Sequence, residues 1–195
     1  MDELNLRFAV WNVCGLNNPA RRTAVTIALE DVLASVVCVS ESKLQSLSMF
    51  DIVEYFGPRY DGFTYLPAMG TAGGVVVAWR SEEVRVLQSR VDSFSVSVEV
   101  ASTDGTTWWL TAVYGPTCAA LKPIFLEELR ILRRELAGPW AVAGDFNIIT
   151  SVADKNTPVV DRRALGMFRR GLNDVELRES PLLGRRFTWS NERAS

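Results

Sequence analysis

Histidine is absent from the 195 residues of this chain. These residues alone therefore cannot form a Ser-His-Asp triad, a Cys-His pair or a zinc site that uses imidazole. Since no pair of cysteines has metal-ligand spacing either, any metal chemistry that they support must rely on oxygen ligands, which suit magnesium or manganese.

Cysteine is scarce, and the three cysteines, Cys14, Cys38 and Cys118, are far apart and odd in number. We interpret them as reduced thiols of a protein in a reducing compartment. The opening residues MDELNLRF lack a basic region followed by a long apolar stretch, so no secretory signal is expected. No run approaches the roughly 18 apolar residues of a membrane span. We therefore expect a nuclear or cytoplasmic protein that is neither secreted nor embedded in a membrane.

Acidic and basic side chains nearly balance, 23 against 21, but they are unevenly distributed. Residues 1–150 hold 12 basic and 17 acidic side chains, whereas residues 151–195 hold 9 and 6. The basic excess in the second part favours a polyanionic partner, although a solvated arginine-rich face explains it equally well. The length fits about one domain, which we assign to residues 1–195.

The pattern of apolar residues predicts a domain in which strands and helices alternate, with antiparallel strands in the middle. We expect a loop at 57–72 and an Asp-Gly turn at 103–106. The predicted helices are 17–35, 44–56, 120–136 and 161–173, and the predicted strands are 6–11, 36–39, 73–79, 94–100, 108–115, 140–144 and 186–189. This order indicates an α/β sandwich with mixed sheets.

Polar side chains follow several of the buried strands, at the point where each strand ends. They are Asn12, Glu41, Tyr114, and the pair Asp145 and Asn147. In open α/β sheets, ligands bind outside the carboxyl ends of the strands, where the sheet holds each terminal side chain in place. We therefore expect these side chains to converge on one pocket.

The chemistry of these groups suits hydrolysis of a phosphodiester by water. Glu41 is a hard oxygen ligand for a divalent cation, and Asn12 could support it. Asp145 could orient or deprotonate a water, while Asn147 and Tyr114 could bind oxygens that carry developing negative charge. Taken singly, each residue also has a structural interpretation as a turn, cap or packing residue.

The joint pattern is more specific than its parts. The segments WNVCGLNNPARR, VVCVSESKL, GGVVVAW, VYGP, GDFN and RRFTWSNER occur in this order along the chain. In order and separation they resemble the endonuclease/exonuclease/phosphatase family, and most of all the endonuclease domain of plant LINE-type non-LTR retrotransposons. This resemblance implies a DNase-I-like four-layer α/β sandwich, with two mixed sheets flanked by helices.

The resemblance also implies roles for individual residues. Asn12 and Glu41 fall on the metal side of the family's site, which holds Mg²⁺ or Mn²⁺. Asp145 and Asn147 fall on the pair that activates water and stabilises the transition state, and Tyr114 on the family's tyrosine. The implied contacts to the substrate are Thr188, which falls on a threonine near the phosphate, and its neighbours Arg186, Ser190 and Asn191. DNA is the implied partner, together with the rest of a retrotransposon polyprotein.

Two features depart from the family pattern. The motif that usually reads Gln-Glu-Thr-Lys is here Ser40-Glu41-Ser42-Lys43, which keeps the glutamate. The family also continues with a further Asp and a final Ser-Asp-His strand, and neither that histidine nor those last strands are found in these 195 residues. Since one acid–base group contributes roughly 10²–10⁴-fold to a rate, we expect activity in this chain alone to be weak or lost.

Two other functions fit the sequence. The first is a catalytically degenerate module that keeps the fold and binds nucleic acid through arginines, namely Arg162, Arg163, Arg169, Arg170, Arg185 and Arg186. The second is a phosphatase of the same family that acts on a sugar or inositol phosphate, for which the sequence shows no evident head-group pocket.

Overall fold

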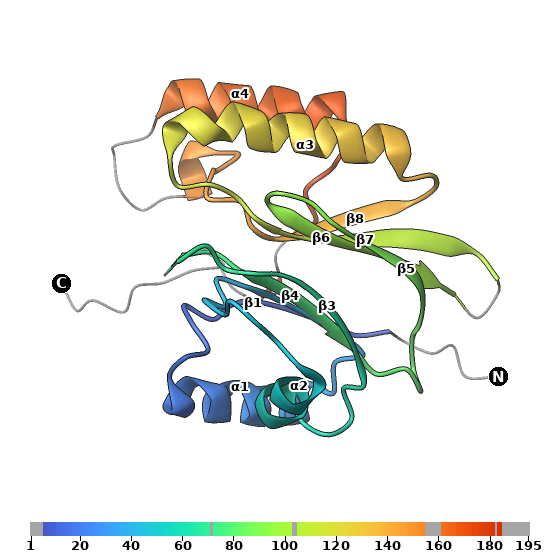
Figure 1. The fold of residues 1–195 in the computed structure, drawn as a ribbon. Helices are drawn as coiled ribbons and strands as arrows, with labels where there is room; N and C mark the ends of the chain where they lie inside the picture. Colours follow the sequence, from blue (N-terminus) through green and yellow to red (C-terminus); the bar gives the residue numbers. More distant parts are fainter. Residues whose placement is uncertain (1–5, 71, 103–104, 155–160, 182, 185–195) are drawn as a thin grey trace.

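The computed structural model describes residues 6–70, 72–102, 105–154, 161–181 and 183–184. They form four layers in the order helices, sheet, sheet, helices (Figure 1). The helices are α1 (Pro19–Val32), α2 (Met49–Phe56), α3 (Lys122–Glu135) and α4 (Arg162–Asp174), with short 3₁₀ turns η1 (Ala119–Leu121) and η2 (Val152–Asp154). The strands are β1 (Phe8–Asn12), β2 (Val36–Ser40), β3 (Gly62–Leu66), β4 (Val75–Trp79), β5 (Arg85–Val91), β6 (Ser95–Ala101), β7 (Thr107–Tyr114) and β8 (Trp140–Asp145). This arrangement confirms the predicted four-layer α/β sandwich.

Both sheets are mixed. The first sheet has the strand order β1-β2-β4-β3, in which only β1 and β2 run parallel. The second sheet has the order β5-β6-β7-β8, in which only β7 and β8 run parallel. Each sheet therefore carries one pair of strands whose carboxyl ends lie side by side, and each of these pairs includes an outer strand.

Two helices begin where the sequence places a cap. The side chain of Asn18 accepts a hydrogen bond from the N–H of Ala20 at 2.9 Å, and Pro19 opens α1. Helix α2 begins after Ser48, whose side chain and backbone exchange hydrogen bonds with Asp51 in a capping box. The predicted helix 44–56 is therefore correct from residue 49 onward, whereas residues 44–48 lead into it.

The core lies in three parts, one between the sheets and one under each pair of helices. Between the sheets it consists mainly of valines such as Val36, Val77 and Val98, which are fully buried. Burial of each such side chain contributes about 1.5–3 kcal/mol. Strand β2 is buried on both faces, which explains its unbroken apolar sequence.

The prediction of a loop throughout 57–72 is wrong, because β3 lies within it. Strand β3 pairs with β4 along its length at the edge of the first sheet, and it is only half-buried. Gly62 opens the strand because the indole of Trp79 occupies the space of a side chain, with a ring atom 2.2 Å from the position of a Cβ. A glycine at the start and an edge position together make the strand look like a loop in the sequence.

Strand β5 is a second edge strand that the apolar pattern does not predict. Its residues alternate poorly because the register shifts between Val86 and Gln88, and most of its side chains are exposed. The other helices and strands lie close to their predicted bounds. The strand expected at 186–189 and part of the turn at 103–106 lie outside the described residues.

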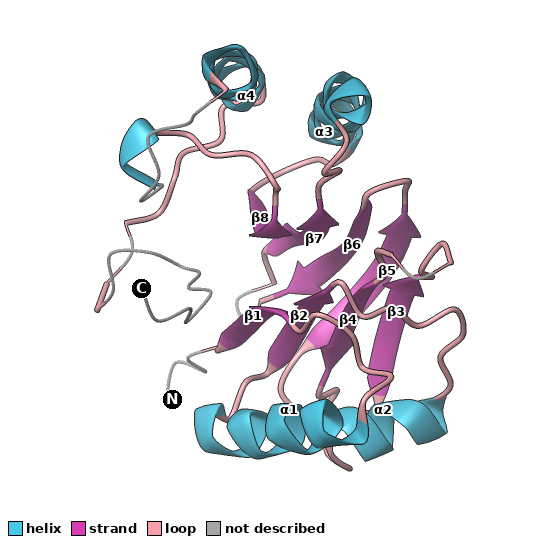
Figure 2. Cartoon of the chain, turned by 90° about the vertical axis from the view of Figure 1, so that its left-hand side faces the viewer, coloured by secondary structure: helices cyan, strands magenta, loops and turns pink. Residues whose placement is uncertain are grey.

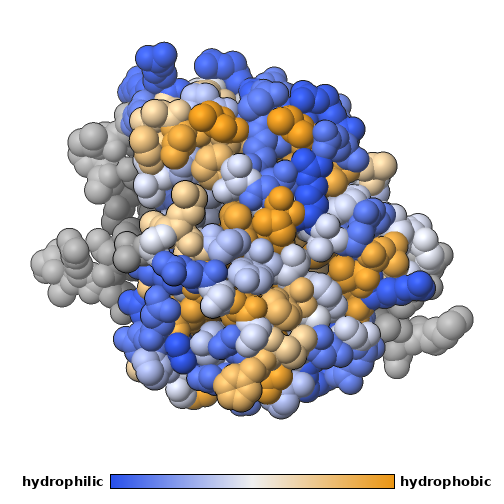
Figure 3. Space-filling model, in the orientation of Figure 1, coloured by the Kyte–Doolittle hydropathy of each residue, from blue (hydrophilic) through white to orange (hydrophobic). Residues whose placement is uncertain are grey.

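Apolar side chains reach the surface at α2, over the lower part of the face in Figure 3. Met49, Phe50 and Val53 lie on its exposed side, while Ile52 and Phe56 point into the core. Among the described residues, no helix is both long and apolar enough to cross a bilayer.

Candidate active site

The polar residues predicted at the strand ends meet at one end of the sandwich. Asn12 ends β1 opposite Ser40 of β2, and Tyr114 ends β7 opposite Asp145 of β8. Figure 2 shows β1 and β8, the outer strands of the two sheets, on the same side of the sandwich. The carboxyl ends of the two parallel pairs thus lie together where the two sheets face each other.

A hydrogen bond joins the two sheets at this point. The side-chain nitrogen Nδ2 of Asn12 donates to Oδ2 of Asp145 at 2.8 Å. The other amide atom, Oδ1, accepts the backbone N–H of Cys14 at 3.0 Å. Asn12 is therefore held on both sides, and it links the first motif of the sequence to the Gly-Asp-Phe-Asn motif.

The turn after β8 holds Asp145 and Asn147 in a fixed relation. The backbone N–H of Asn147 donates to Oδ1 of Asp145 at 2.9 Å, and its side-chain Nδ2 donates to the carbonyl of Gly115 at 2.8 Å. The N–H of Gly115 in turn donates to the carbonyl of Asp145 at 2.7 Å. Because a Cβ on Gly115 would lie 2.1 Å from the carbonyl oxygen of Phe146, only glycine fits there.

Glu41 follows β2 on a loop that a neighbouring segment holds in place. The backbone N–H groups of Ser42 and Lys43 donate to the carbonyls of Gly74 and Gly73, at 3.1 and 3.0 Å. The ammonium Nζ of Lys43 lies 3.2 Å from Oε1 of Glu41, and both side chains are partly exposed. A cation therefore already lies beside the carboxylate that the sequence predicts as a metal ligand.

The backbone is strained around these residues. Six described residues other than glycine have a positive φ, and four of them lie in the segments just described, namely Cys14 (50°), Glu41 (56°), Lys43 (59°) and Asn147 (52°). Each such conformation costs on the order of 1–3 kcal/mol. Strain of this kind gathers at functional sites, so its position supports a site here.

The phenol of Tyr114 shares this environment with both acidic side chains. Burial raises the pKa of Tyr114 above its ordinary value, and the negative charges of Glu41 and Asp145 raise it further. A hydrogen bond with the Asn147 side chain acts in the opposite direction but does not outweigh them. The phenol therefore keeps its proton at neutral pH and can donate it in a hydrogen bond.

The oxygen atoms present fit a hard divalent cation. In the described part of the chain, no three or more Cys, Asp or Glu side chains gather closely enough to hold a metal by themselves. Magnesium is commonly held by only one or two carboxylates, with water and substrate phosphate as its other ligands. Glu41 and Asn12 provide such a set, and the hydroxyl of Ser40, next to Glu41, is buried without a hydrogen-bond partner among the described residues. An orphan hydroxyl here fits a site completed by water or substrate.

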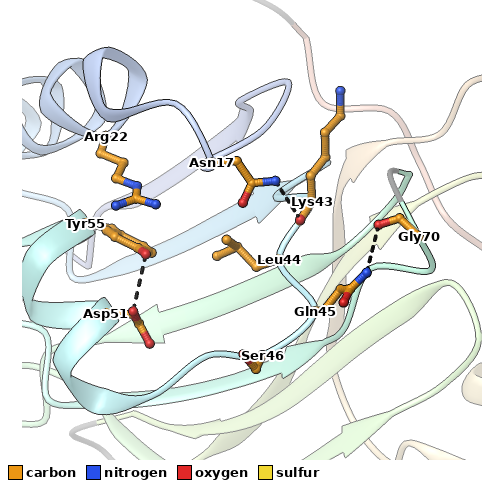
Figure 4. Close-up of a pocket in the computed structure, with 9 residues that line it drawn as sticks. All are labelled: Asn17, Arg22, Lys43, Leu44, Gln45, Ser46, Asp51, Tyr55 and Gly70. Carbon is orange, nitrogen blue, oxygen red and sulfur yellow. Dashed lines mark hydrogen bonds between the residues drawn. The ribbon is translucent and has the colours of Figure 1, made fainter.

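A separate hollow of about 620 Å³ lies beside this cluster, between α1, α2 and the loop after Lys43 (Figure 4). Arg22 stacks over the ring of Tyr55 at 4.4 Å there and pairs with Glu54 at 3.1 Å. None of the predicted site residues lines this hollow, and in Figure 4 the ammonium of Lys43 points away from it. We therefore place the candidate site at the strand ends.

The structure brings together Asn12, Glu41, Tyr114, Asp145 and Asn147, all of which the sequence predicts. Arg186, Thr188, Ser190 and Asn191 lie outside the described residues. Sequence reasoning gave no role to Cys14 or Lys43, although both lie within the quoted motifs. The thiol of Cys14 contacts Oδ1 of Asn12 at 3.4 Å. The contacts of Cys14 and Lys43 depend on their left-handed backbone conformations, which cannot be predicted from the residue types.

Solved structures share this fold over most of the chain. An AP endonuclease from Archaeoglobus fulgidus has a TM-score of 0.67 at 17% identity, and the match covers 88% of this chain and 70% of that one. The AP endonuclease LMAP from Leishmania major gives 0.64 at 17% identity, with 87% and 66% covered. The endonuclease domain of TRAS1, a telomere-specific non-LTR retrotransposon, gives 0.64 at 12% identity, with 87% and 72% covered.

At these identities the likeness shows the fold alone, and the chain spans about two thirds of the length of the LMAP enzyme. No curated protein sequence matches the chain. A family model, described as the Endonuclease/Exonuclease/phosphatase family, matches residues 9–193. The match covers nearly the whole sequence, including every residue of the cluster at the strand ends. The chain therefore belongs to the Endonuclease/Exonuclease/phosphatase family.

Proposed function

We propose that this chain hydrolyses phosphodiester bonds of DNA with the help of a divalent metal ion, as an endonuclease of the retrotransposon type. The observation that carries the proposal is the hydrogen bond of 2.8 Å from Asn12 to Asp145. It joins two motifs that lie 133 residues apart, at the point where the parallel strands of both sheets end.

Asp145 is the proposed partner of the attacking water. Its Oδ2 accepts from Asn12 and its Oδ1 from the N–H of Asn147, so the carboxylate is oriented by two donors. A carboxylate has further lone pairs, and these can accept a proton of a bound water and direct the water's oxygen toward phosphorus.

Asn147 and Tyr114 are the proposed donors to the phosphate oxygens. One N–H of the Asn147 amide donates to the carbonyl of Gly115, and the second, which faces the phenol of Tyr114, is the one proposed to donate to a substrate oxygen. The phenol of Tyr114 carries its proton at neutral pH because its pKa is raised by burial and by the two acidic neighbours. Both groups can therefore stabilise negative charge that develops in the transition state.

Glu41 and Asn12 are the proposed ligands of Mg²⁺ or Mn²⁺. When bound, such an ion supplies Lewis acidity at a phosphate oxygen. Lys43 lies 3.2 Å from Glu41 and keeps positive charge beside the same carboxylate.

DNA is the proposed substrate, since the solved structures of this fold include two AP endonucleases and the endonuclease domain of a non-LTR retrotransposon. The plant LINE-type origin, a polyprotein context, and a nuclear or cytoplasmic location stay predictions. The level of activity is also a prediction. No histidine occurs in the 195 residues, so the acid–base group that the family's histidine provides is not among them, and we expect weak cleavage.

Nicking of supercoiled plasmid DNA in the presence of Mg²⁺ tests the proposal. The variant Asp145→Asn keeps the shape of the side chain but removes its charge, and we expect nicking to fall by about 10²–10⁴-fold. Asp174→Asn is the matched control, because Asp174 is a surface carboxylate that pairs with Arg130 at 2.8 Å. Measurable nicking by the wild type that Asp145→Asn leaves unchanged would show that the cluster is not the catalytic centre.

A nucleic-acid-binding module without catalysis is the second candidate, and exposed arginines on α4 favour it. Arg162, Arg163, Arg169 and Arg170 are all exposed on that helix. DNA binding without nicking, whose affinity falls steeply with salt, would support this function over hydrolysis.

A further inference from the structure

Glu128 is a buried carboxylate on α3 that the proposed chemistry does not use. It is only 9% exposed, and it lies on the face of the helix that packs against the second sheet. Its oxygens accept the backbone N–H groups of Ser93 and Phe94, at 2.9 and 3.1 Å, and the hydroxyl of Ser95 at 2.7 Å. A buried charge is tolerated only with such partners, so the helix and the turn before β6 are tightly coupled.

That turn is in direct contact with the backbone of Tyr114. The carbonyl of Phe94 accepts the backbone N–H of Tyr114 at 2.9 Å, one residue beyond the β6–β7 pairs. Phe94 therefore uses its N–H to bind Glu128 and its carbonyl to bind Tyr114. Displacement of the turn would shift the end of β7, from which the phenol extends.

The same helix also reaches the Gly-Asp-Phe-Asn turn. The ring of Phe125, three residues before Glu128, packs edge-on against Phe94 with ring centres 5.7 Å apart. Phe125 also packs against Phe146, with ring centres 6.1 Å apart. Phe146 lies between Asp145 and Asn147 in the chain. Phe125 therefore contacts both segments of the second sheet that carry site residues, the turn next to Tyr114 and the turn from Asp145 to Asn147.

We propose that α3 is the positioning element of the site, in which Glu128 and Phe125 together set the placement of the Tyr114 phenol relative to Asp145 and Asn147. The proposal rests on the proposed function for its catalytic meaning. Glu128 is a positioning residue in it, since it contacts Tyr114 only through Phe94. A role in stability alone would leave the site unchanged in molecules that remain folded.

The variants Glu128→Gln and Glu127→Gln separate these two roles. Glu127 is the adjacent residue on α3, but it is exposed and pairs with Arg130 at 3.2 Å. Glutamine at 128 removes the negative charge, leaves one amide oxygen for the two backbone N–H groups and puts an NH₂ group beside the Ser95 hydroxyl, so the contacts that hold the turn become weaker. The readout is the NMR resonance of the phenol carbon of Tyr114, measured without metal at neutral pH. With only four tyrosines in the chain, the variant Tyr114→Phe assigns it.

We expect Glu128→Gln to shift the Tyr114 resonance while the protein stays folded, and Glu127→Gln to leave it in place. Nicking by Glu128→Gln should fall about 10- to 100-fold through the rate rather than the apparent affinity, as expected for a small misplacement. If Glu128→Gln does not fold, Ser95→Ala removes one donor to the carboxylate and should give a smaller shift in the same direction.

An unchanged Tyr114 resonance in a folded Glu128→Gln or Ser95→Ala variant would overturn the proposal. Since the resonance needs neither DNA nor metal, it is independent of the proposed function. If the resonance shifts but the protein never nicks DNA, the coupling through α3 is supported and the proposed hydrolysis of DNA is contradicted. If the resonance does not shift but the protein nicks DNA, the hydrolysis is supported and the coupling is contradicted.

Discussion

The amide nitrogen of Asn12 and the carboxylate of Asp145 lie 2.8 Å apart, although they belong to different sheets. The first sheet supplies Asn12 and Glu41, the proposed metal side of the site. The second sheet supplies Tyr114, Asp145 and Asn147, the side proposed to act on water and phosphate. This contact therefore fixes the relation between the two halves, and the packing of the sheets sets the geometry of the chemistry.

Replacement of Asn12 by alanine should lower activity far more than stability. The change removes the donor to Asp145 and the acceptor for the N–H of Cys14, and the site is only half-buried. Each of these two hydrogen bonds contributes about 1 kcal/mol, so urea unfolding should measure a loss of about 2 kcal/mol. Plasmid nicking should fall by at least about 10²-fold, since the water partner loses its orientation and the metal loses a ligand. A loss of stability of several kcal/mol with unchanged nicking would instead make Asn12 a structural residue.

Replacement of Glu41 by glutamine should weaken metal binding. Glu41 is the one carboxylate on the metal side of the proposed site, and its present cationic partner is Lys43 at 3.2 Å. Binding of Mn²⁺, followed by electron paramagnetic resonance, should become at least about 10-fold weaker in Glu41→Gln. Glu54→Gln is a suitable control, because Glu54 lies on α2, away from the strand ends, and pairs with Arg22 of α1. Equal Mn²⁺ affinity in both variants would contradict the assignment of Glu41.

Removal of metal should abolish nicking, and Mg²⁺ should restore it. The measurement is nicking by the wild type in EDTA, before and after excess Mg²⁺ is added. Persistent nicking in EDTA would mean that Glu41 and Asn12 hold no essential ion.

The positions of the site residues are predictable because an apolar run that ends in a polar residue is visible in the sequence, although β1, which ends in Asn12, proves to be largely exposed rather than buried as expected. The convergence of the strand-end residues on one pocket follows from the strand ends, but the hydrogen bond between Asn12 and Asp145 depends on how two sheets pack and was not predicted. The support by Glu128 was not predictable at all. A glutamate beside Leu129 on an amphipathic helix looks like a solvated charge, and its partners lie 33 to 35 residues away in the chain.

Strands β3 and β5 illustrate the same limit in the fold. Both are edge strands whose side chains are mostly half-buried or exposed, and their sequences carry neither an unbroken apolar run nor a regular alternation. Strand β2, in contrast, is buried on both faces and is evident from four consecutive apolar residues, Val36 to Val39. Burial on two faces constrains residue type, and an edge position does not.

Replacement of Gly115 by alanine should disrupt the site and destabilise the fold. The new methyl group would lie 2.1 Å from the backbone oxygen of Phe146, which cannot move without the Asp145–Asn147 turn. We expect a loss of about 1–3 kcal/mol in the free energy of unfolding, together with loss of nicking. Gly166→Ala is the control, since Gly166 is in α4 and a Cβ there would have no neighbour closer than 3.8 Å. That variant should gain up to about 1 kcal/mol, because alanine favours a helix.

Cys38 should be inert in the folded protein, in contrast to the two exposed cysteines. Burial in the middle of β2 raises the pKa of the Cys38 thiol from 9.0 to about 12, so almost no thiolate forms at pH 8. We expect a thiol reagent such as DTNB to modify two cysteines in the native protein, Cys14 and Cys118, and the third only after unfolding. The variant Cys38→Val should have two modified cysteines both in the native protein and after unfolding.

The raised pKa also predicts how stability depends on pH. The unfolded chain releases the Cys38 proton near pH 9, whereas the folded protein holds it to about pH 12. Ionisation therefore favours the unfolded state as the pH rises through this window, and the stabilising contribution of the protonated thiol is lost. Between pH 8 and pH 10 the wild type should lose about 1 kcal/mol relative to Cys38→Val in urea unfolding. Because both proteins share every other titrating group, a constant difference across this range would mean that the Cys38 thiol ionises equally in both states.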